Sequence, residues 1–257
     1  MSFIRIQDTD PLMAATFLFS NYINEVAVFE FTSEGFTIVA SNPSLRFIST
    51  FYIDKNSCVD FNIPQSHIVS LSLPLFRGAI MAATPARFDT MAISFQAPDQ
   101  MILTFENSTP SGPVPNLDHQ YVLDLSASEA VDLPLPVNTQ FVTVKAQYFG
   151  HVLAELPFLP DDLVCITPSS WDVKFSLAST EITLTEEDGQ CLNLGYDDVY
   201  DTEFYVVLQP RMFFLNLSFR TTANVWFFRT DNMGSLMVVP TSEPYAGYFI
   251  HFPRMTP

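Results

Sequence analysis

The sequence predicts an α+β protein built from two copies of one strand-rich unit, each with two short helices. Three observations predict this fold class. Runs of Val, Ile, Phe and Thr alternate with polar residues along most of the chain, as in half-buried strands. Four segments break this alternation and suit short helices. Finally, elements of the same type recur at one constant offset, which indicates an internal duplication.

The predicted strands form two sets, one in each half of the 257-residue chain. In the first half, the alternating runs are residues 25–31, 36–40, 45–53, 58–63, 88–95 and 101–105. In the second half, they are residues 141–145, 163–167, 171–177, 181–185, 203–208, 224–230, 236–239 and 248–252. Because short runs succeed one another with turns between them, we expect strand meanders.

The four predicted helices cover residues 11–22, 74–83, 146–156 and 210–221. Three of them open with proline, whose missing N–H costs nothing in the first helical position. The starts at Pro74 and Pro210 differ by 210 − 74 = 136 residues. The same shift carries residues 10–20 onto 146–156, 25–40 onto 161–176, 88–95 onto 224–231 and 101–105 onto 237–241. This agreement predicts a tandem repeat.

A connector separates the two predicted domains, which cover residues 1–106 and 137–257. Its first part holds the proline-rich run STPSGPVPN, which is typical of a linker. Its second part is apolar and acidic, and two interpretations stay open: an edge strand of the second sheet, or a docking strip for partner peptides. The residues predicted to dock peptides are Tyr121, Leu123, Leu125, Leu133, Leu135 and Val239.

Composition favours a folded protein and argues against an ordinary nucleic-acid binder. Hydrophobic residues make up 48% of the chain, whereas the net charge is −17 with only 11 Lys and Arg. Phosphates attract basic surfaces, so any DNA-binding hypothesis has to explain this charge. The sequence shows neither the pattern of a signal peptide nor an apolar run long enough to span a membrane. We therefore expect a soluble intracellular protein with no membrane partner.

No pattern in the sequence indicates a metal, a cofactor or catalysis. The three cysteines and four histidines are scattered, without the spacing of a disulfide framework or a zinc site. Motifs for a nucleophilic serine, a phosphate-binding loop and a zinc hydrolase are missing. The acidic group Asp197, Asp198, Asp201 and Glu203 could hold a divalent cation, but its setting favours an exposed loop. We predict no catalytic residue.

Three further motifs follow one another along the chain, EFTSEGFTIVASN at residues 30–42, LPLPVNTQFVTVK at 133–145 and DNMG at 231–234. In this order they resemble motifs of the DNA sliding clamp family that includes proliferating cell nuclear antigen. Within the family, RTDNMGSLMVV at 229–239, followed by GYFIHF, is most similar to the middle subunit of the nine-one-one checkpoint clamp. The resemblance implies tandem clamp domains with sheets on the outside of a ring and two short helices per domain on its inner face.

The resemblance also implies a function. Such a chain would be a non-catalytic, nuclear scaffold in a trimeric ring around double-stranded DNA, with other clamp subunits, a clamp loader and client proteins as partners. The DNA-facing residues would be Arg77, Arg87, Lys145, Arg211 and Arg220. Arg77 and Arg211 are favoured because each follows a helix-opening proline, in what the sequence suggests are equivalent repeat positions. Subunits would join through exposed strand edges at residues 101–105 and 181–185, with Met101, Leu103, Phe105, Ile182 and Leu184 at the interface.

Three functional hypotheses follow. The chain is a clamp subunit, either in a checkpoint heterotrimer or as a replicative homotrimeric processivity factor for DNA polymerase. Alternatively, it is a two-domain peptide-binding protein without DNA, or an enzyme with an acidic site. The predicted helix at residues 11–22 carries no basic residue, although the inner helices of the family usually carry several lysines. This departure favours the mixed ring over the replicative one.

Overall fold

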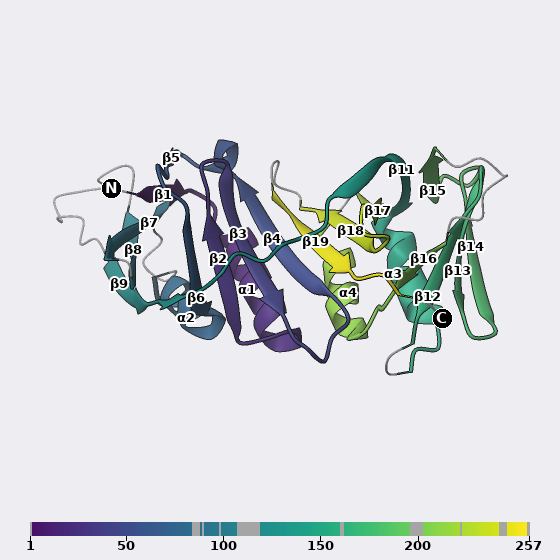
Figure 1. Cartoon of the computed structure of the whole chain (residues 1–257), viewed down its shortest axis with the longest axis horizontal. Helices are drawn as coiled ribbons and strands as arrows, with labels where there is room; N and C mark the ends of the chain where they lie inside the picture. Colours follow the sequence, from purple (N-terminus) through teal and green to yellow (C-terminus); the bar gives the residue numbers. More distant parts are fainter. Residues whose placement is uncertain are drawn as a thin grey trace. The chain divides into compact units, whose positions relative to one another are not determined.

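The chain folds into two compact units in the computed structural model, which describes residues 2–83, 88, 90–97, 99–106, 119–159, 162–195, 203–221, 223–241 and 246–255 (Figure 1). The first unit takes in residues 2–40 and most of 50–131. The second takes in residues 41–49, most of 132–241 and 247–255. The second unit therefore takes residues 41–49 from the first half of the sequence.

The first unit holds two antiparallel sheets and two helices. Its helices are α1 (Asp10–Tyr22) and α2 (Leu73–Ala83), which pack against each other. Its strands are β1 (Phe3–Ile6), β2 (Val26–Phe31), β3 (Gly35–Ser41), β4 (Ile48–Asp54), β5 (Asp60–Asn62), β6 (His67–Ser72), β7 (Thr90–Ala97), β8 (Gln100–Glu106), β9 (His119–Asp124) and β10 (Ser126–Ala127). One sheet has the order β5-β1-β7-β8-β9, and in the other the strands run β10-β6-β2-β3-β4.

The second unit repeats this arrangement. Its helices are α3 (Ala146–Glu155) and α4 (Arg211–Ser218). Its strands are β11 (Pro136–Lys145), β12 (Val164–Pro168), β13 (Asp172–Leu177), β14 (Thr180–Thr185), β15 (Cys191–Leu194), β16 (Phe204–Val206), β17 (Asn224–Thr230), β18 (Ser235–Pro240) and β19 (Ala246–Phe252). The strands run β15-β11-β17-β18-β19 in one sheet and β14-β13-β12-β16 in the other.

The order of elements shows that the two units are copies of one fold. From β1 to β9 the first unit reads strand, helix, five strands, helix, three strands, and the second unit reads the same from β11 to β19. Replacing each element by its counterpart also converts the order β5-β1-β7-β8-β9 into β15-β11-β17-β18-β19. The duplication inferred from the 136-residue offset is thus matched element by element.

Aromatic side chains fill both cores, because alternate strand residues and one helix stripe are apolar. In the first unit Phe29 packs edge-on against Phe76 of α2, at 5.2 Å between ring centres. In the second, Phe149 of α3 packs in the same way against Phe227 of β17, at 5.8 Å. All four side chains are fully buried. Helices α2 and α3 are therefore each fixed to a sheet of their own unit by an aromatic pair.

The structure contains all four predicted helices and the predicted strands, with ends that differ by a few residues. Strand β6 was not predicted, although His67–Ser72 alternates partly and fully buried residues. The predicted strand at residues 58–63 is reduced to β5, which follows a short 3₁₀ turn at Lys55–Ser57. The predicted connector contributes β9 and β10 to sheets of the first unit.

Candidate nucleic-acid interface and peptide groove

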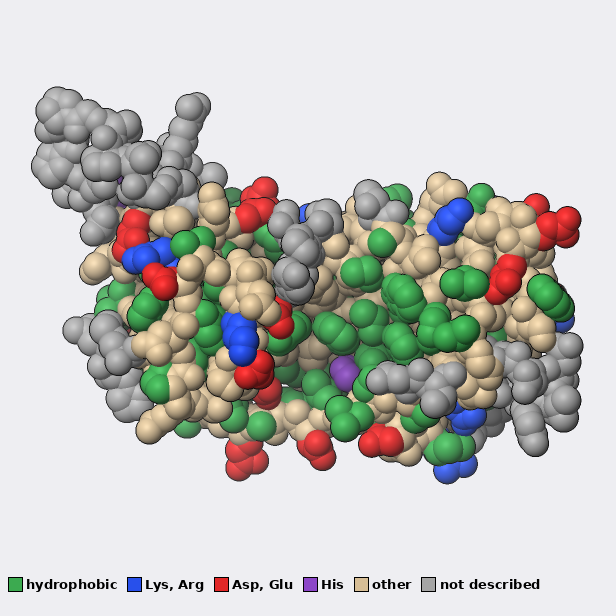
Figure 2. Space-filling model, turned by 90° about the horizontal axis from the view of Figure 1, so that it is seen from above, with side chains coloured by type: hydrophobic (Ala, Val, Ile, Leu, Met, Phe, Trp, Pro, Cys, Tyr) green, Lys and Arg blue, Asp and Glu red, His purple; other side chains and the backbone are tan. Residues whose placement is uncertain are grey.

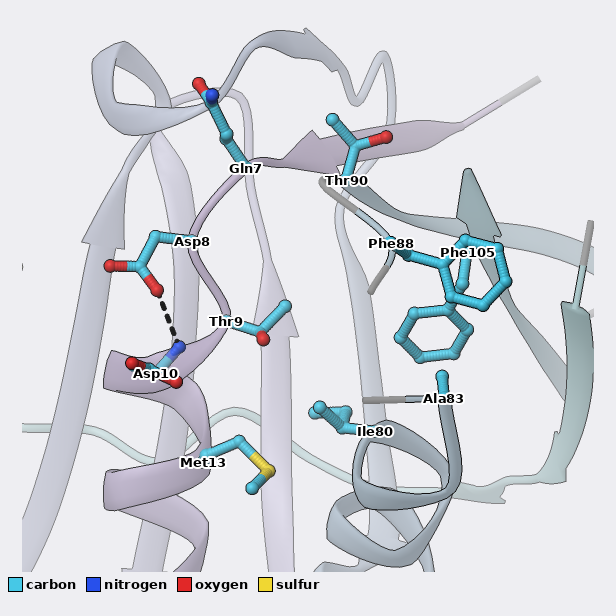
Figure 3. Close-up of a pocket in the computed structure, with 10 residues that line it drawn as sticks. All are labelled: Gln7, Asp8, Thr9, Asp10, Met13, Ile80, Ala83, Phe88, Thr90 and Phe105. Carbon is cyan, nitrogen blue, oxygen red and sulfur yellow. Dashed lines mark hydrogen bonds between the residues drawn. The ribbon is translucent and has the colours of Figure 1, made fainter. Parts of the chain in front are cut away.

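The helices of the first unit carry little positive charge. Helix α1 has no basic residue, and Asp10 opens it with its N–H bonded to the Asp8 carboxylate at 2.8 Å (Figure 3). Both carboxylates border a cavity of about 350 Å³ that also meets Phe88 and Phe105. The one cation of α2, Arg77, places its guanidinium carbon 4.9 Å from the centre of the Phe17 ring. This cation–π contact holds the charge against α1.

The helices of the second unit carry most of the predicted DNA-facing cations. Lys145 is exposed at the N-cap of α3, and Arg220 is exposed just after α4. Arg211 donates from Nη2 to the Ala154 carbonyl at 2.8 Å, which satisfies a group in the last turn of α3. A groove of about 750 Å³ between α3 and α4 is lined by Lys145 and by Phe219, which is 77% exposed.

The predicted equivalence of Arg77 and Arg211 is wrong. Arg211 is the first residue of α4, whereas Arg77 lies in the second turn of α2. The reason is that Arg77 comes three residues after Pro74 whereas Arg211 follows Pro210 directly, so the 136-residue offset matches Arg77 to residue 213 (77 + 136 = 213). Arg87 lies outside the described residues. The role of these cations toward DNA stays a prediction, and two of them, Lys145 and Arg220, are exposed.

Charges on the surface agree with the acidic composition. On the face drawn in Figure 2, Lys and Arg side chains are few and apolar side chains form a broad group. Two of the basic residues of the first unit are neutralised locally, because Arg5 pairs with Asp60 at 2.9 Å and Lys55 with Glu34 at 2.8 Å. The cations beside α3 and α4 of the second unit are thus a local exception to this acidic surface.

The structure corrects the predicted subunit edge at Met101, Leu103 and Phe105. These side chains are 0%, 0% and 3% exposed, and β8 lies between β7 and β9. The end strand of this sheet is β9, which pairs along β8 with Leu123 opposite Met101. Sequence alternation alone could not show which strand comes last in a sheet. Strand β14, which contains the predicted Ile182 and Leu184, is the end strand of its own sheet.

The predicted peptide-docking strip is also corrected in part. Leu123 and Leu125 are each 8% exposed and Val239 is 0% exposed, so these three side chains belong to the core. Tyr121 pairs opposite Leu103 within the sheet. The alternative interpretation, an edge strand, is right for the element but wrong for the sheet, because β9 belongs to the first unit. Leu135 is 69% exposed, and Leu133 is partly exposed.

A groove that the sequence did not predict lies in the second unit beside Leu133 and Leu135. It measures about 440 Å³, and its lining comes from four separate stretches of chain. Apolar side chains dominate the lining, and they are Pro43, Leu45, Phe47, Ile48, Pro134, Phe252 and Pro253. The polar and charged side chains of the lining are Ser41, Asn42, Arg46, Asp132, Asn232 and His251. A mostly apolar groove with a few polar groups suits an apolar peptide anchor.

Phe47 fixes one wall of this groove. Its ring lies 5.6 Å from Phe213, 5.4 Å from Phe214 and 6.0 Å from Phe252, and its side chain is 2% exposed. Residues 41–49 are therefore anchored to α4 and β19, although they come from the first half of the sequence. On the other side, the Asp231 N–H donates a hydrogen bond to the Leu135 carbonyl oxygen at 3.0 Å, which joins the turn after β17 to the segment that precedes β11.

The turn at Asn232 shapes the end of the groove. The Asn232 side-chain oxygen accepts from the Thr230 hydroxyl at 2.7 Å and from the Gly234 N–H at 3.1 Å. A Cβ atom at Gly234 would stand 2.4 Å from the Phe252 carbonyl oxygen, so glycine is required at this position. The DNMG motif thus brings β18 close to β19 and sets Asn232 beside Phe252.

One buried polar side chain of the groove has an unusual environment. His251 is 8% exposed, and its Nδ1 has no hydrogen-bond partner among the described residues. Burial lowers the pKa of His251 from 6.5 to about 4, because the charged imidazolium is poorly solvated there. The side chain is therefore neutral near pH 7.

The described residues contain no group of three or more His, Cys, Asp or Glu side chains that could hold a metal ion. Asp197, Asp198 and Asp201 lie outside the described part of the chain, and Glu203 accepts a hydrogen bond from the Tyr205 hydroxyl.

Burial raises the pKa of the Cys58 and Cys191 thiols to about 11, so both stay protonated at neutral pH. No described helix is long and apolar enough to cross a membrane.

No protein-family model matches the sequence, and neither does any curated protein. Solved structures do match. One is the PCNA2–PCNA3 complex from Sulfolobus tokodaii, with a TM-score of 0.71 and 14% identity, covering 98% of both chains. Another is the proliferating cellular nuclear antigen from Entamoeba histolytica, with a TM-score of 0.74 and 12% identity over 100% of both chains. The chain therefore has the two-domain α+β fold of these sliding clamps over its full length.

Proposed function

We propose that the chain is a non-catalytic subunit of a ring-shaped sliding clamp that encircles duplex DNA. The observation that carries the proposal is the repeated element and strand order of the two units, on a fold that known clamps share along the whole chain. Encirclement reconciles a net charge of −17 with a DNA partner. A closed ring stays on the duplex even when each phosphate contact is weak, and weak contacts permit sliding.

The second unit is the better candidate for touching phosphates. Lys145 and Arg220 are exposed beside α3 and α4, whereas Asp8 and Asp10 stand at the start of α1. A few local cations attract phosphate, while an acidic surface elsewhere repels DNA and restricts its path. Because the second unit supplies three of the four described candidate cations, we favour a mixed ring in which other subunits contribute the remainder. A checkpoint heterotrimer in the nucleus is the specific form that we infer.

Ring closure would use the two end strands, β9 and β14. Each has one edge that no described strand of its own sheet covers. Exposed strand edges tend to pair with another chain, and subunit assembly satisfies that tendency. The groove beside Leu135 would then receive client peptides, and a clamp loader would open the ring on DNA.

Assembly tests this proposal. The purified chain is mixed with pairs of candidate clamp chains, sized, and then loaded onto nicked circular DNA with a loader. We expect the chain to form a three-chain ring only with different clamp chains and to be retained until the DNA is linearised. A trimer of the chain alone would favour a replicative clamp. Failure to assemble with any clamp chain would refute the clamp proposal.

The groove supports a second candidate, a two-domain peptide-binding protein that acts without DNA. Its apolar lining and its position beside exposed Leu135 are the favouring observations. The two candidates differ in one readout. A peptide-binding protein would bind peptides as a monomer and would never be retained on circular DNA, even in the presence of every clamp chain and loader.

A further inference from the structure

The polar groups of the second unit's groove differ in how far the protein itself satisfies them. Asn232 has two donors on its side-chain oxygen, as described above, and the Asn42 side-chain oxygen accepts from the Ser44 N–H at 2.9 Å. His251 stands apart. It is 92% buried and borders the groove, and its Nδ1 has no partner in the described part of the chain.

The position of the imidazole proton follows from this environment. A neutral imidazole carries one N–H and one bare nitrogen. A buried N–H without an acceptor is rare in proteins, whereas an acceptor that lacks a donor is tolerated more often. Nδ1 is therefore the bare nitrogen, and Nε2 carries the proton. Because His251 lines the groove and Nδ1 is the ring nitrogen that is fully buried without a partner, Nε2–H is the polar group that this side chain can offer there.

A docked peptide would change the surroundings of this N–H. Water can accept its hydrogen bond while the groove is open, but an apolar side chain that fills the groove displaces that water. Leaving a buried donor unpaired costs ~1–3 kcal/mol. Pro43, Pro134 and Pro253 line the same groove without any backbone N–H of their own, so they offer a docked peptide no backbone donor. The ligand's carbonyls and the His251 donor therefore complement each other.

We propose that Nε2–H of His251 is a specificity-determining donor that selects an extended peptide whose main-chain carbonyl lies beside its apolar anchor. The proposal rests on peptide docking in this groove, which belongs to the proposed function. The lining holds one base, Arg46, and one acid, Asp132, so it carries no net positive charge that would favour a carboxylate over a neutral carbonyl. Every extended peptide carries main-chain carbonyls. His251 would therefore distinguish peptides by the position of a carbonyl relative to the apolar anchor.

The first test needs no ligand. We expect NMR of the full chain labelled with ¹⁵N-histidine to show Nε2 protonated and Nδ1 bare at pH 7. The exposed His151 of α3 is the internal reference, because solvent allows both of its tautomers. A proton on Nδ1 of His251 would overturn the proposal, whatever becomes of the clamp or of peptide docking.

The second test uses a displayed library of linear 12-residue peptides, selected on the full chain, with Ile48→Arg as the variant that blocks the groove. We expect His251→Leu to weaken the selected peptides about 5- to 10-fold, the loss of one neutral hydrogen bond. His251→Gln keeps an N–H donor and should restore part of the affinity. His151→Leu is the matched control and should change nothing.

The outcomes separate the two proposals. If Ile48→Arg abolished the binding of the selected peptides but His251→Leu left their affinity unchanged, the role of His251 as a donor would be refuted. The groove would still be a peptide-docking site. Selection of no groove-dependent peptide would refute docking and, with it, the role of His251 as a selector. An ester in place of one peptide bond of the best ligand weakens that carbonyl as an acceptor. We expect one ester position to lower affinity for the wild type more than for His251→Leu, and equal losses at every position would refute a main-chain acceptor.

Discussion

The two units share one strand order but carry opposite charge where their first helices begin. Under the 136-residue offset, Thr9 and Asp10 of the first unit correspond to Lys145 and Ala146 of the second. The first unit adds Asp8 beside a small cavity, and the second adds Arg220 beside α4. The comparison teaches that buried aromatic and aliphatic side chains specify this fold, while the exposed helix residues are free to differ.

The variant with the largest expected effect tests whether the cores of the two units are stabilised independently of each other. Phe47→Ala should cost the second unit ~3–5 kcal/mol of unfolding free energy, because it removes a ring packed against Phe213, Phe214 and Phe252. Phe36→Ala is the matched change in the first unit, where Phe36 stacks on Phe31 at 5.3 Å. Hydrogen exchange should show each loss in its own unit. Equal loss of protection in both would show one cooperative core.

A change of pH should act mainly on the second unit. The pKa of His251 is about 4 in the folded chain and 6.5 ordinarily, so the unfolded state binds the proton more readily. The free energy of unfolding is therefore highest above pH 6.5. It falls by about 3 kcal/mol in all as the pH is lowered toward 4, because the unfolded chain takes up the proton first. Denaturant unfolding from pH 7 to pH 4 measures this loss. His251→Leu should flatten that dependence, and an unchanged slope would contradict the burial argument.

Exchanging equivalent helix-start residues would sharpen the charge comparison. For the assembled ring on a short duplex, Lys145→Thr should lower the slope of log affinity against log salt by about 0.9, since one phosphate contact is lost. Thr9→Lys should raise the slope by a similar amount if the first unit also faces DNA. Lys55→Thr is the control, because Lys55 already pairs with Glu34. If the slope of log affinity against log salt were the same for all three variants, the second unit would not contact the DNA phosphates through Lys145.

The smallest expected effect concerns Arg211. Arg211→Ala should cost ~0.5–1.5 kcal/mol of stability, because the Ala154 carbonyl loses its donor. Arg254→Ala, a change at an exposed position after β19, should cost less. Thermal unfolding compares the two. A large change in the salt slope with no change in stability would instead assign Arg211 to DNA.

Local sequence signals predicted most of the fold and little of the groove. Helices and strands follow from apolar spacing within ten or so residues, and the repeat offset follows from their order. The neighbour of β8 could not be predicted, because Tyr121 and Leu123 would alternate equally well in either sheet. The groove was missed because Phe47, Pro134 and His251 lie far apart in the sequence. Its local signals were the motifs at residues 30–42, 133–145 and 231–234, each of which supplies only one or two lining residues.

The shared strand order of the two units has an evolutionary consequence. A duplicated gene first produces two halves with the same surface, and each half can then accumulate substitutions as long as its buried residues are kept. In this chain one half has kept or gained cations beside its helices, and the other has acidic residues at the matching place. Because the buried residues maintain the fold, the two halves of one chain can present different surfaces to different partners.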